Sequence, residues 1–216
     1  MSHYIVLLTM GLLTSLWGCG QKKVLTDNEI EICTTISYDQ SIAEELKKET
    51  NSDIILLPEI SEYGEVLKTN DEGLCSKIAA EQGFHFVIKN KEHFRSKGYL
   101  LFVFEDDNNQ KYLATIKGTN EFEILKWRQT NGINHGLENK DVIAKLENWK
   151  SKYDFAIVGV AIDWLQFQFT GTRPKFETFA KEVYEFCPDI VDQGTGDMPT
   201  LISELKKADG VFLWWD

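Results

Sequence analysis

Tyr99-Leu-Leu-Phe-Val-Phe104 is the most apolar stretch of the chain after its N-terminal segment. A polar stretch, Glu105-Asp-Asp-Asn-Asn-Gln110, follows it, and the β-prone residues 111–117 come next. Two β-prone runs separated by a polar turn are typical of a hairpin. We therefore expect two antiparallel strands here, and the alternation of Glu121–Trp127 predicts a third strand after them.

Upstream of this hairpin the sequence predicts a mixture of short strands and helices. A strand is expected where β-prone residues alternate or where a short apolar run is stopped by proline, and a helix where apolar residues lie four apart. The expected strands are Ile30–Ile36, Asp53–Pro58 and Gly83–Lys89, and the expected helices are Ser41–Glu49 and, loosely, 61–82.

The downstream half has clearer boundaries, because prolines and glycines separate its segments. The expected elements are a helix over Asn139–Tyr153, strands over Phe155–Ile162 and Trp164–Phe169, a helix from Pro174 to Pro188, a helix capped by Asp197, and a closing strand over Val211–Trp215. Their order, βαββαβ, predicts a ferredoxin-like arrangement. The whole chain is expected to be α+β, with a mixed or antiparallel sheet and helices packed on one face.

Composition narrows the classes of function. The chain has 216 residues, of which 34 are acidic and 23 basic, so its formal charge is -11. Phosphate recognition needs basic patches, so a nucleic-acid binder is disfavoured. Hydrophobic residues make up 43% of the chain and charged residues 26%, which is an ordinary globular composition.

The N-terminus has the pattern of an export signal. Residues 1–18 carry no Lys, Arg, Asp or Glu, and their apolar run is too short to span a bilayer as a helix. Leu16-Trp17-Gly18-Cys19 resembles a bacterial lipobox, in which the signal is cut before a cysteine that becomes lipidated. We expect a signal peptide over 1–18, lipidation at Cys19 and a location in the cell envelope, on its periplasmic or extracellular face. A buried N-terminal helix is the alternative.

The domain organisation follows from this pattern. After the signal peptide we expect a tether over 19–29, an N-terminal α/β region over 30–117 and a C-terminal domain over 118–216. If Cys19 carries lipid, one intramolecular disulfide is conceivable, between Cys33 and Cys75, although nothing in the spacing requires it. The four histidines are scattered, so neither a metal site nor a cofactor is expected.

The C-terminal hundred residues carry several short motifs. These are Thr130-Asn131-Gly132-x-Asn134, Asp163-Trp164, the run from Cys187 to Gly196 (Cys-Pro-Asp-Ile-Val-Asp-Gln-Gly-Thr-Gly) and the terminal Leu213-Trp214-Trp215-Asp216. On these motifs the segment resembles the bacterial family called domain of unknown function 4253. The resemblance implies a shared fold and site region but no reaction. His135 stands where members usually carry Tyr.

We take the polar and aromatic residues of these motifs as candidate binding residues. They are Thr130, Asn131, Asn134, Trp164, Asp189, Asp192, Gln193, Thr195 and Trp215. Catalytic residues are not assigned. Cys187 lies on the apolar stripe of a predicted helix, at the end where the helix dipole disfavours a thiolate, so we interpret it as a core residue.

The sequence leaves two classes of function open. We favour a binding module, and the negative charge suits a basic protein partner, for instance a toxin domain neutralised by an immunity-type protein. The alternative is a hydrolase that uses an acidic cluster of Asp163, Asp189 and Asp192, joined by Asp216, because paired carboxylates can flank a substrate.

Overall fold

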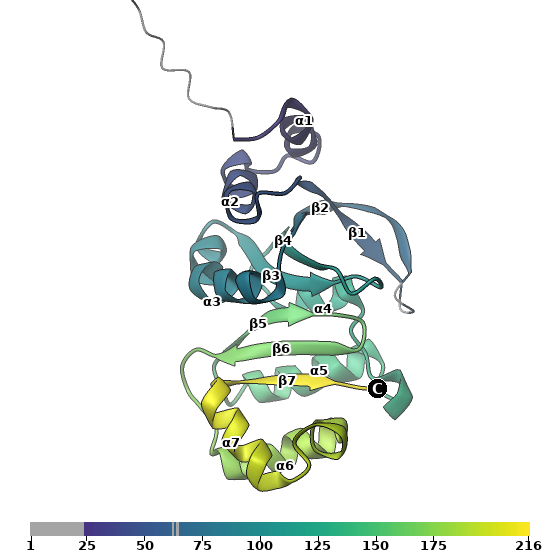
Figure 1. Cartoon of the computed structure of the whole chain (residues 1–216), viewed down its shortest axis with the longest axis vertical. Helices are drawn as coiled ribbons and strands as arrows, with labels where there is room; N and C mark the ends of the chain where they lie inside the picture. Colours follow the sequence, from purple (N-terminus) through teal and green to yellow (C-terminus); the bar gives the residue numbers. More distant parts are fainter. Residues whose placement is uncertain (1–23, 62, 64) are drawn as a thin grey trace, which may run out of the picture.

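A computed structural model describes residues 24–61, 63 and 65–216 of the chain. The described residues form a seven-stranded mixed sheet in the order β1-β2-β4-β3-β5-β6-β7 (Figure 1). The predicted signal peptide and Cys19 lie outside the described residues. Within the described part of the chain, no helix has the length and apolar character needed to cross a membrane.

Helices and strands are interspersed along the described residues. The strands are β1 (Ile55–Ile60), β2 (Val66–Lys77), β3 (Tyr99–Glu105), β4 (Lys111–Lys117), β5 (Phe155–Val160), β6 (Trp164–Phe169) and β7 (Gly210–Trp214). The α-helices are α1 (Asp27–Thr35), α2 (Gln40–Thr50), α3 (Ala80–Ser96), α4 (Phe122–Arg128), α5 (Asn139–Lys150), α6 (Phe176–Phe186) and α7 (Met198–Ala208). A 3-10 helix covers Ile133–His135, and a π-helix covers Ile190–Thr195.

The predicted central hairpin is confirmed. β3 and β4 pair antiparallel in register, from Tyr99 opposite Lys117 to Glu105 opposite Lys111. β3 also pairs parallel with β5, where Val103 lies opposite Gly159, and the sheet thereby continues across the predicted boundary at residue 117. The other neighbouring strand pairs of the described chain are antiparallel, so the predicted α+β class with a mixed sheet is confirmed.

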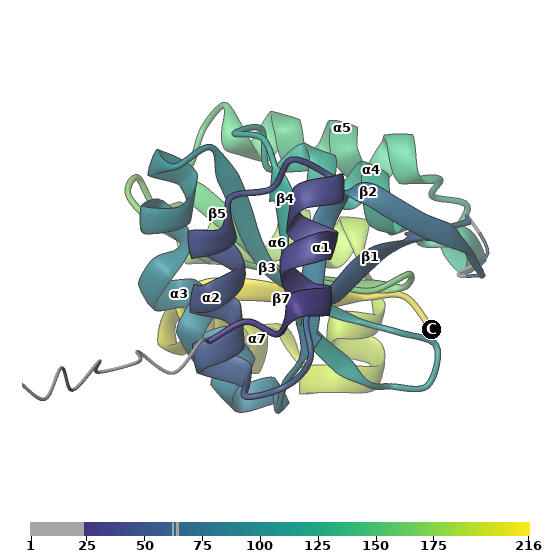
Figure 2. The same ribbon diagram turned by 90° about the horizontal axis from the view of Figure 1, so that it is seen from above.

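Helices cover both faces of this sheet, so the prediction of helices on one face is wrong. α1, α2 and α3 pack on one face, and α4 to α7 pack on the other (Figures 1 and 2). β3 shows why both faces are covered. Leu101 and Val103 pack in the core on the side of α1 to α3, whereas Phe102 and Phe104 pack in the core on the side of α4 to α7. A strand that is apolar at every position needs cover on both sides.

Two predicted strands are helices. Residues 30–36 belong mostly to α1, which also takes in the last residues of the predicted tether, because Thr26 caps its N-terminus in a capping box with Glu29. Residues 83–89 lie in α3, whose buried Val87 and Phe94 are seven residues apart, on one helical face. Phe84 and Phe86 are two residues apart, as apolar residues on one face of a strand are, and this spacing led to the wrong prediction.

Two further segments exchange their predicted types. The segment 61–82, expected as a loose helix, contains β2, where Leu74 and Cys75 are buried in opposite cores as strand neighbours must be. The third predicted strand of the meander is instead α4, which buries Phe122 and Leu125 on one helical face. Short apolar runs allow both readings, and tertiary packing decides between them.

The rest of the C-terminal half follows the prediction. The two strands β5 and β6, the helices after them and the closing strand lie where the sequence placed them. Because α4 replaces a strand, however, the order in residues 118–216 is ααββααβ. β5, β6 and β7 are consecutive antiparallel neighbours, whereas a ferredoxin-like sheet inserts another strand between those that a helix connects. The ferredoxin-like expectation is therefore wrong.

The three cysteines that the structure describes do not pair. Cys33 and Cys75 are free and fully buried, and they belong to the cores on opposite faces of the sheet. The disulfide that the sequence left open therefore does not form.

Glu29 joins the first two helices to the start of the sheet. Its carboxylate accepts hydrogen bonds from the N–H of Thr26 at 2.8 Å, from Lys47 at 2.7 Å and from the N–H of Ile54 at 2.8 Å. Burial acts to raise the pKa of Glu29, but these hydrogen bonds outweigh it and lower that pKa from 4.5 to about 2. The ionised carboxylate therefore stabilises the fold.

We predict that Glu29 supplies about 3 kcal/mol of pH-dependent stability, which follows from the size of the pKa shift. The contribution is present above pH 4.5 and is lost as the pH falls towards 2, because the folded-state pKa is the lower one. In urea unfolding between pH 3 and 7, the free energy of unfolding of Glu29→Gln should fall less steeply with decreasing pH than that of the wild type. Glu31→Gln, at an exposed position of the same helix, is the control and should keep the wild-type slope.

Candidate functional site

The turn between β5 and β6 brings two of the sequence motifs together. The carbonyl of Ala161 accepts a hydrogen bond from the hydroxyl of Thr130 at 2.7 Å. The next carbonyl, that of Ile162, accepts one from the N–H of Asn131 at 2.8 Å. The N–H of Trp215 donates to the next carbonyl, that of Asp163, at 2.9 Å. The Thr130–Asn134 motif and the terminal motif are thus fixed to the same turn.

Asp189 fixes the remaining motif to this assembly. One carboxylate oxygen lies 2.9 Å from the N–H of Asp216 and 2.9 Å from Nε2 of His135. The other oxygen accepts a hydrogen bond from Gln193 at 3.0 Å. Burial acts to raise the pKa of Asp189, but these hydrogen bonds outweigh it and hold that pKa below its usual value. Asp189 therefore bridges three chain segments as an anion.

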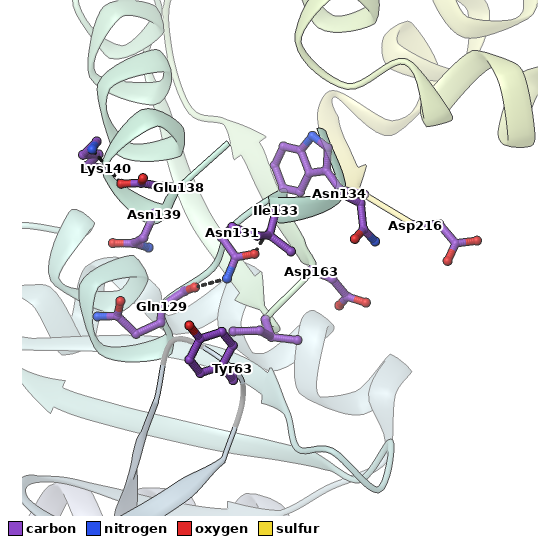
Figure 3. A pocket seen from close by; sticks show the side chains of 12 residues that line it. Tyr63, Gln129, Asn131, Ile133, Asn134, Glu138, Asn139, Lys140, Asp163 and Asp216 are labelled. Atoms are coloured by element: carbon purple, nitrogen blue, oxygen red, sulfur yellow. Dashed lines mark hydrogen bonds and ion pairs between the residues drawn. The ribbon is translucent and has the colours of Figure 1, made fainter. Parts of the chain in front are cut away.

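A pocket of about 530 Å³ opens where these segments meet (Figure 3). Tyr63 comes from the connection between β1 and β2, and the other lining residues come from the C-terminal half. Those residues are Gln129, Asn131, Ile133, Asn134, Glu138, Asn139, Lys140, Ile162, Asp163, Trp215 and Asp216. Residues of the Thr130–Asn134 motif, Asp163 and the terminal motif therefore border one pocket, and the Cys187–Gly196 motif supports it through Asp189.

Two glycines of the motifs allow tryptophans to approach the backbone. A Cβ atom on Gly132 would lie 2.8 Å from the ring of Trp215, and one on Gly194 would lie 2.6 Å from the ring of Trp214. Both distances are shorter than van der Waals contact, so these positions accept no side chain without a shift. The glycines thus set how closely the terminal tryptophans pack against the motif loops.

The polar groups that line the pocket are mostly hydrogen-bond acceptors. The carboxylates of Asp163 and Asp216 accept no hydrogen bond from the residues that the structure describes. The amide nitrogen of Asn139 donates to the carbonyls of Leu125 and Thr130, which leaves its oxygen for the pocket. The lining cation, Lys140, is paired with Glu138 at 2.6 Å. The pocket therefore suits a ligand that is rich in hydrogen-bond donors.

Six of the predicted binding residues build or support the pocket. Asn131, Asn134 and Trp215 line it, and the indole of Trp215 is buried, with Nε1 3.3 Å from the carbonyl of Phe186. Thr130 is fully buried beneath the pocket and holds the β5–β6 turn. Gln193 supports Asp189, as described above.

The other three predicted binding residues lie away from the pocket. Trp164 faces the side of the sheet that carries α3, with its Nε1 3.4 Å from Glu105. Asp192 accepts a hydrogen bond from the hydroxyl of Tyr184 at 3.1 Å. Thr195 donates to the carbonyls of Ile190 and Asp197 and closes the π-helical turn. The acidic cluster is therefore divided: Asp163 and Asp216 line the pocket, and Asp192 does not.

Several pocket residues carried no sequence signal of their own. Gln129, Ile133 and Asn139 stand next to motif residues and could have been found from that adjacency. Tyr63 could not, because it reaches the pocket only through the β1–β2 connection, in a segment expected to be helical. The position of Tyr63 beside the C-terminal half depends on the order of strands in the sheet, which the sequence alone does not show.

Cys187 matches its interpretation as a core residue. It ends α6, is fully buried, and its thiol donates to the carbonyl of Trp214 at 2.9 Å. Burial raises the pKa of Cys187 to about 11, which opposes a role as nucleophile. In the described part of the chain, no group of three or more His, Cys, Asp or Glu side chains is arranged to hold a metal ion.

Residues 112–216 match the family described as "Domain of unknown function (DUF4253)", which confirms the resemblance of the C-terminal hundred residues. The match begins in β4, covers just under half of the chain and includes every lining residue of the pocket except Tyr63. No curated protein and no solved structure matches the chain.

We predict that Asp189→Asn destabilises the protein by about 1–3 kcal/mol, because an amide cannot accept all the hydrogen bonds that reach this buried carboxylate. Asp192→Asn is the matched control on the same loop, and it should change stability by less than about 0.5 kcal/mol because its single hydrogen bond is exposed. Urea unfolding of both variants at pH 7 measures the difference. Equal effects would show that Asp189 does not hold the motif segments together.

Proposed function

We propose that the protein is a binding module, and that its pocket takes a cationic, donor-rich group of a basic protein partner. The single observation that carries the proposal is the surplus of acceptors around the pocket where the motifs converge. A guanidinium or ammonium group offers several N–H donors and a positive charge, and so complements both the acceptors and the carboxylates.

The overall charge supports the same partner. The chain carries a formal charge of -11, and such a field favours encounter with basic surfaces. An immunity-type role, in which the protein neutralises a basic toxin domain, is one form of this proposal. We also retain the proposal of a lipid anchor at Cys19, which would place the binding site at the cell envelope; the lipobox-like residues 16–19 support it.

The geometry offers less support for a hydrolase. Such an enzyme would use Asp163, Asp189 and Asp192 around one substrate, but of these only Asp163 lines the pocket. Asp189 is occupied by three hydrogen bonds. The lining residues include no Ser, Thr, Cys or His that could act as a nucleophile or a general base beside the carboxylates.

We predict that replacing two of the pocket carboxylates, in Asp163→Asn with Asp216→Asn, weakens the binding of acetyl-arginine amide by about tenfold or more. That factor corresponds to about 1.4 kcal/mol, a modest loss for charge-assisted hydrogen bonds. Isothermal titration calorimetry at low ionic strength provides the measurement, and affinity should fall as salt is added.

Asp192→Asn combined with Glu31→Gln serves as the control, because it removes the same two negative charges at exposed positions outside the pocket. It should leave the affinity within about twofold of the wild type. If the double pocket variant binds as tightly as this control, the pocket is not the cation site.

A further inference from the structure

The mouth of the pocket carries two exposed apolar side chains. Tyr63 is 79% exposed and Ile133 is 64% exposed, although both line the pocket. They come from separate segments, the β1–β2 connection and the 3-10 helix, and in Figure 3 Tyr63 lies low in the view while Ile133 lies above it, beside Asn131. Leu67, at the start of β2, is another exposed apolar residue of the same hairpin, at 59%.

This rim differs from the interior of the pocket. The interior presents carboxylates and amides, which complement a cation, whereas the rim presents surface that is costly to leave in water. A small cationic molecule would fill the interior and leave the rim exposed. Arginine is a frequent hot spot of protein interfaces, where the contacts around it exclude water, and the exposed side chains of Tyr63 and Ile133 are placed beside the pocket to make such contacts.

On the basis of the function proposed above, we infer that the pocket recognises a single arginine or lysine side chain presented between apolar residues on the surface of a protein partner. The basic side chain enters the pocket and meets Asp163 and Asp216. The apolar neighbours of that side chain pack against Tyr63 and Ile133. The partner is therefore distinguished by the residues next to its basic side chain, and not by positive charge alone.

Two peptides of equal charge test this inference on the full-length protein. Acetyl-Gly-Arg-Gly-amide presents the arginine alone, and acetyl-Leu-Arg-Leu-amide presents it between apolar residues. We expect calorimetry to show that the leucine peptide binds at least about fivefold more tightly, since burying apolar surface adds to the charged contact.

The double variant Tyr63→Ser with Ile133→Ser should remove this difference, so that it binds the two peptides with affinities within about twofold of each other. Ile88→Ser is the matched control: Ile88 is an exposed isoleucine of α3, at 40%, and does not line the pocket. It should preserve the preference for the leucine peptide. Because all three positions are exposed, the variants should fold, which circular dichroism checks.

The outcomes separate the inference from the function on which it rests. If the glycine peptide binds but the leucine peptide binds no more tightly, the inference is wrong and the cation-binding function stands. If the preference for leucine survives in the double variant, the rim does not provide it and the inference is wrong. If neither peptide binds the wild type, both proposals fail.

Discussion

The burial of β3 and β5 on both faces is the constraint on which the rest of this structure depends. Their neighbouring backbones pair at Val103 and Gly159, and their side chains divide between two cores. A sheet with two apolar faces needs helices on both, so α1 to α3 must cover one side and α4 to α7 the other. Gly159 is part of this constraint, because a Cβ there would lie 2.5 Å from the ring of Phe84. One sheet thereby joins the N-terminal region to the segment that carries the motifs.

The pocket lies beside the turn between β5 and β6, whose backbone is held by the motif residues. The carbonyls of Ala161, Ile162 and Asp163 accept hydrogen bonds from Thr130, Asn131 and Trp215. Asp189 adds charged hydrogen bonds to the same assembly. These hydrogen bonds fix the backbone of the motif segments, and the side chain of Asp163 lines the pocket beside them.

The sequence predicted those parts of the fold in which local signals agree with packing. Asp197 caps α7 as predicted, and Pro174 and Gly210 lie within two residues of the helix ends that they were expected to mark, because caps and helix breakers act within a few residues. Prediction failed for 83–89 and 121–127, because short apolar runs there fit the periodicity of a strand as well as that of a helix. The packing against the rest of the protein decides which of the two forms. The site divides similarly: Asn131, Asn134 and Trp215 stood out as motif residues, whereas Tyr63 enters through tertiary structure alone.

We propose that the acceptor-rich pocket bordered by motif residues of the C-terminal half binds a cationic group. The most direct test is a ¹⁵N-NMR titration of the full-length protein with acetyl-arginine amide, which maps the contact without any substitution. The account predicts saturable shifts concentrated in the amides of 129–134, 162–163 and 215–216, and little change in α1 to α3. Shifts spread evenly over the acidic surface, or centred on another part of the sheet, would contradict it.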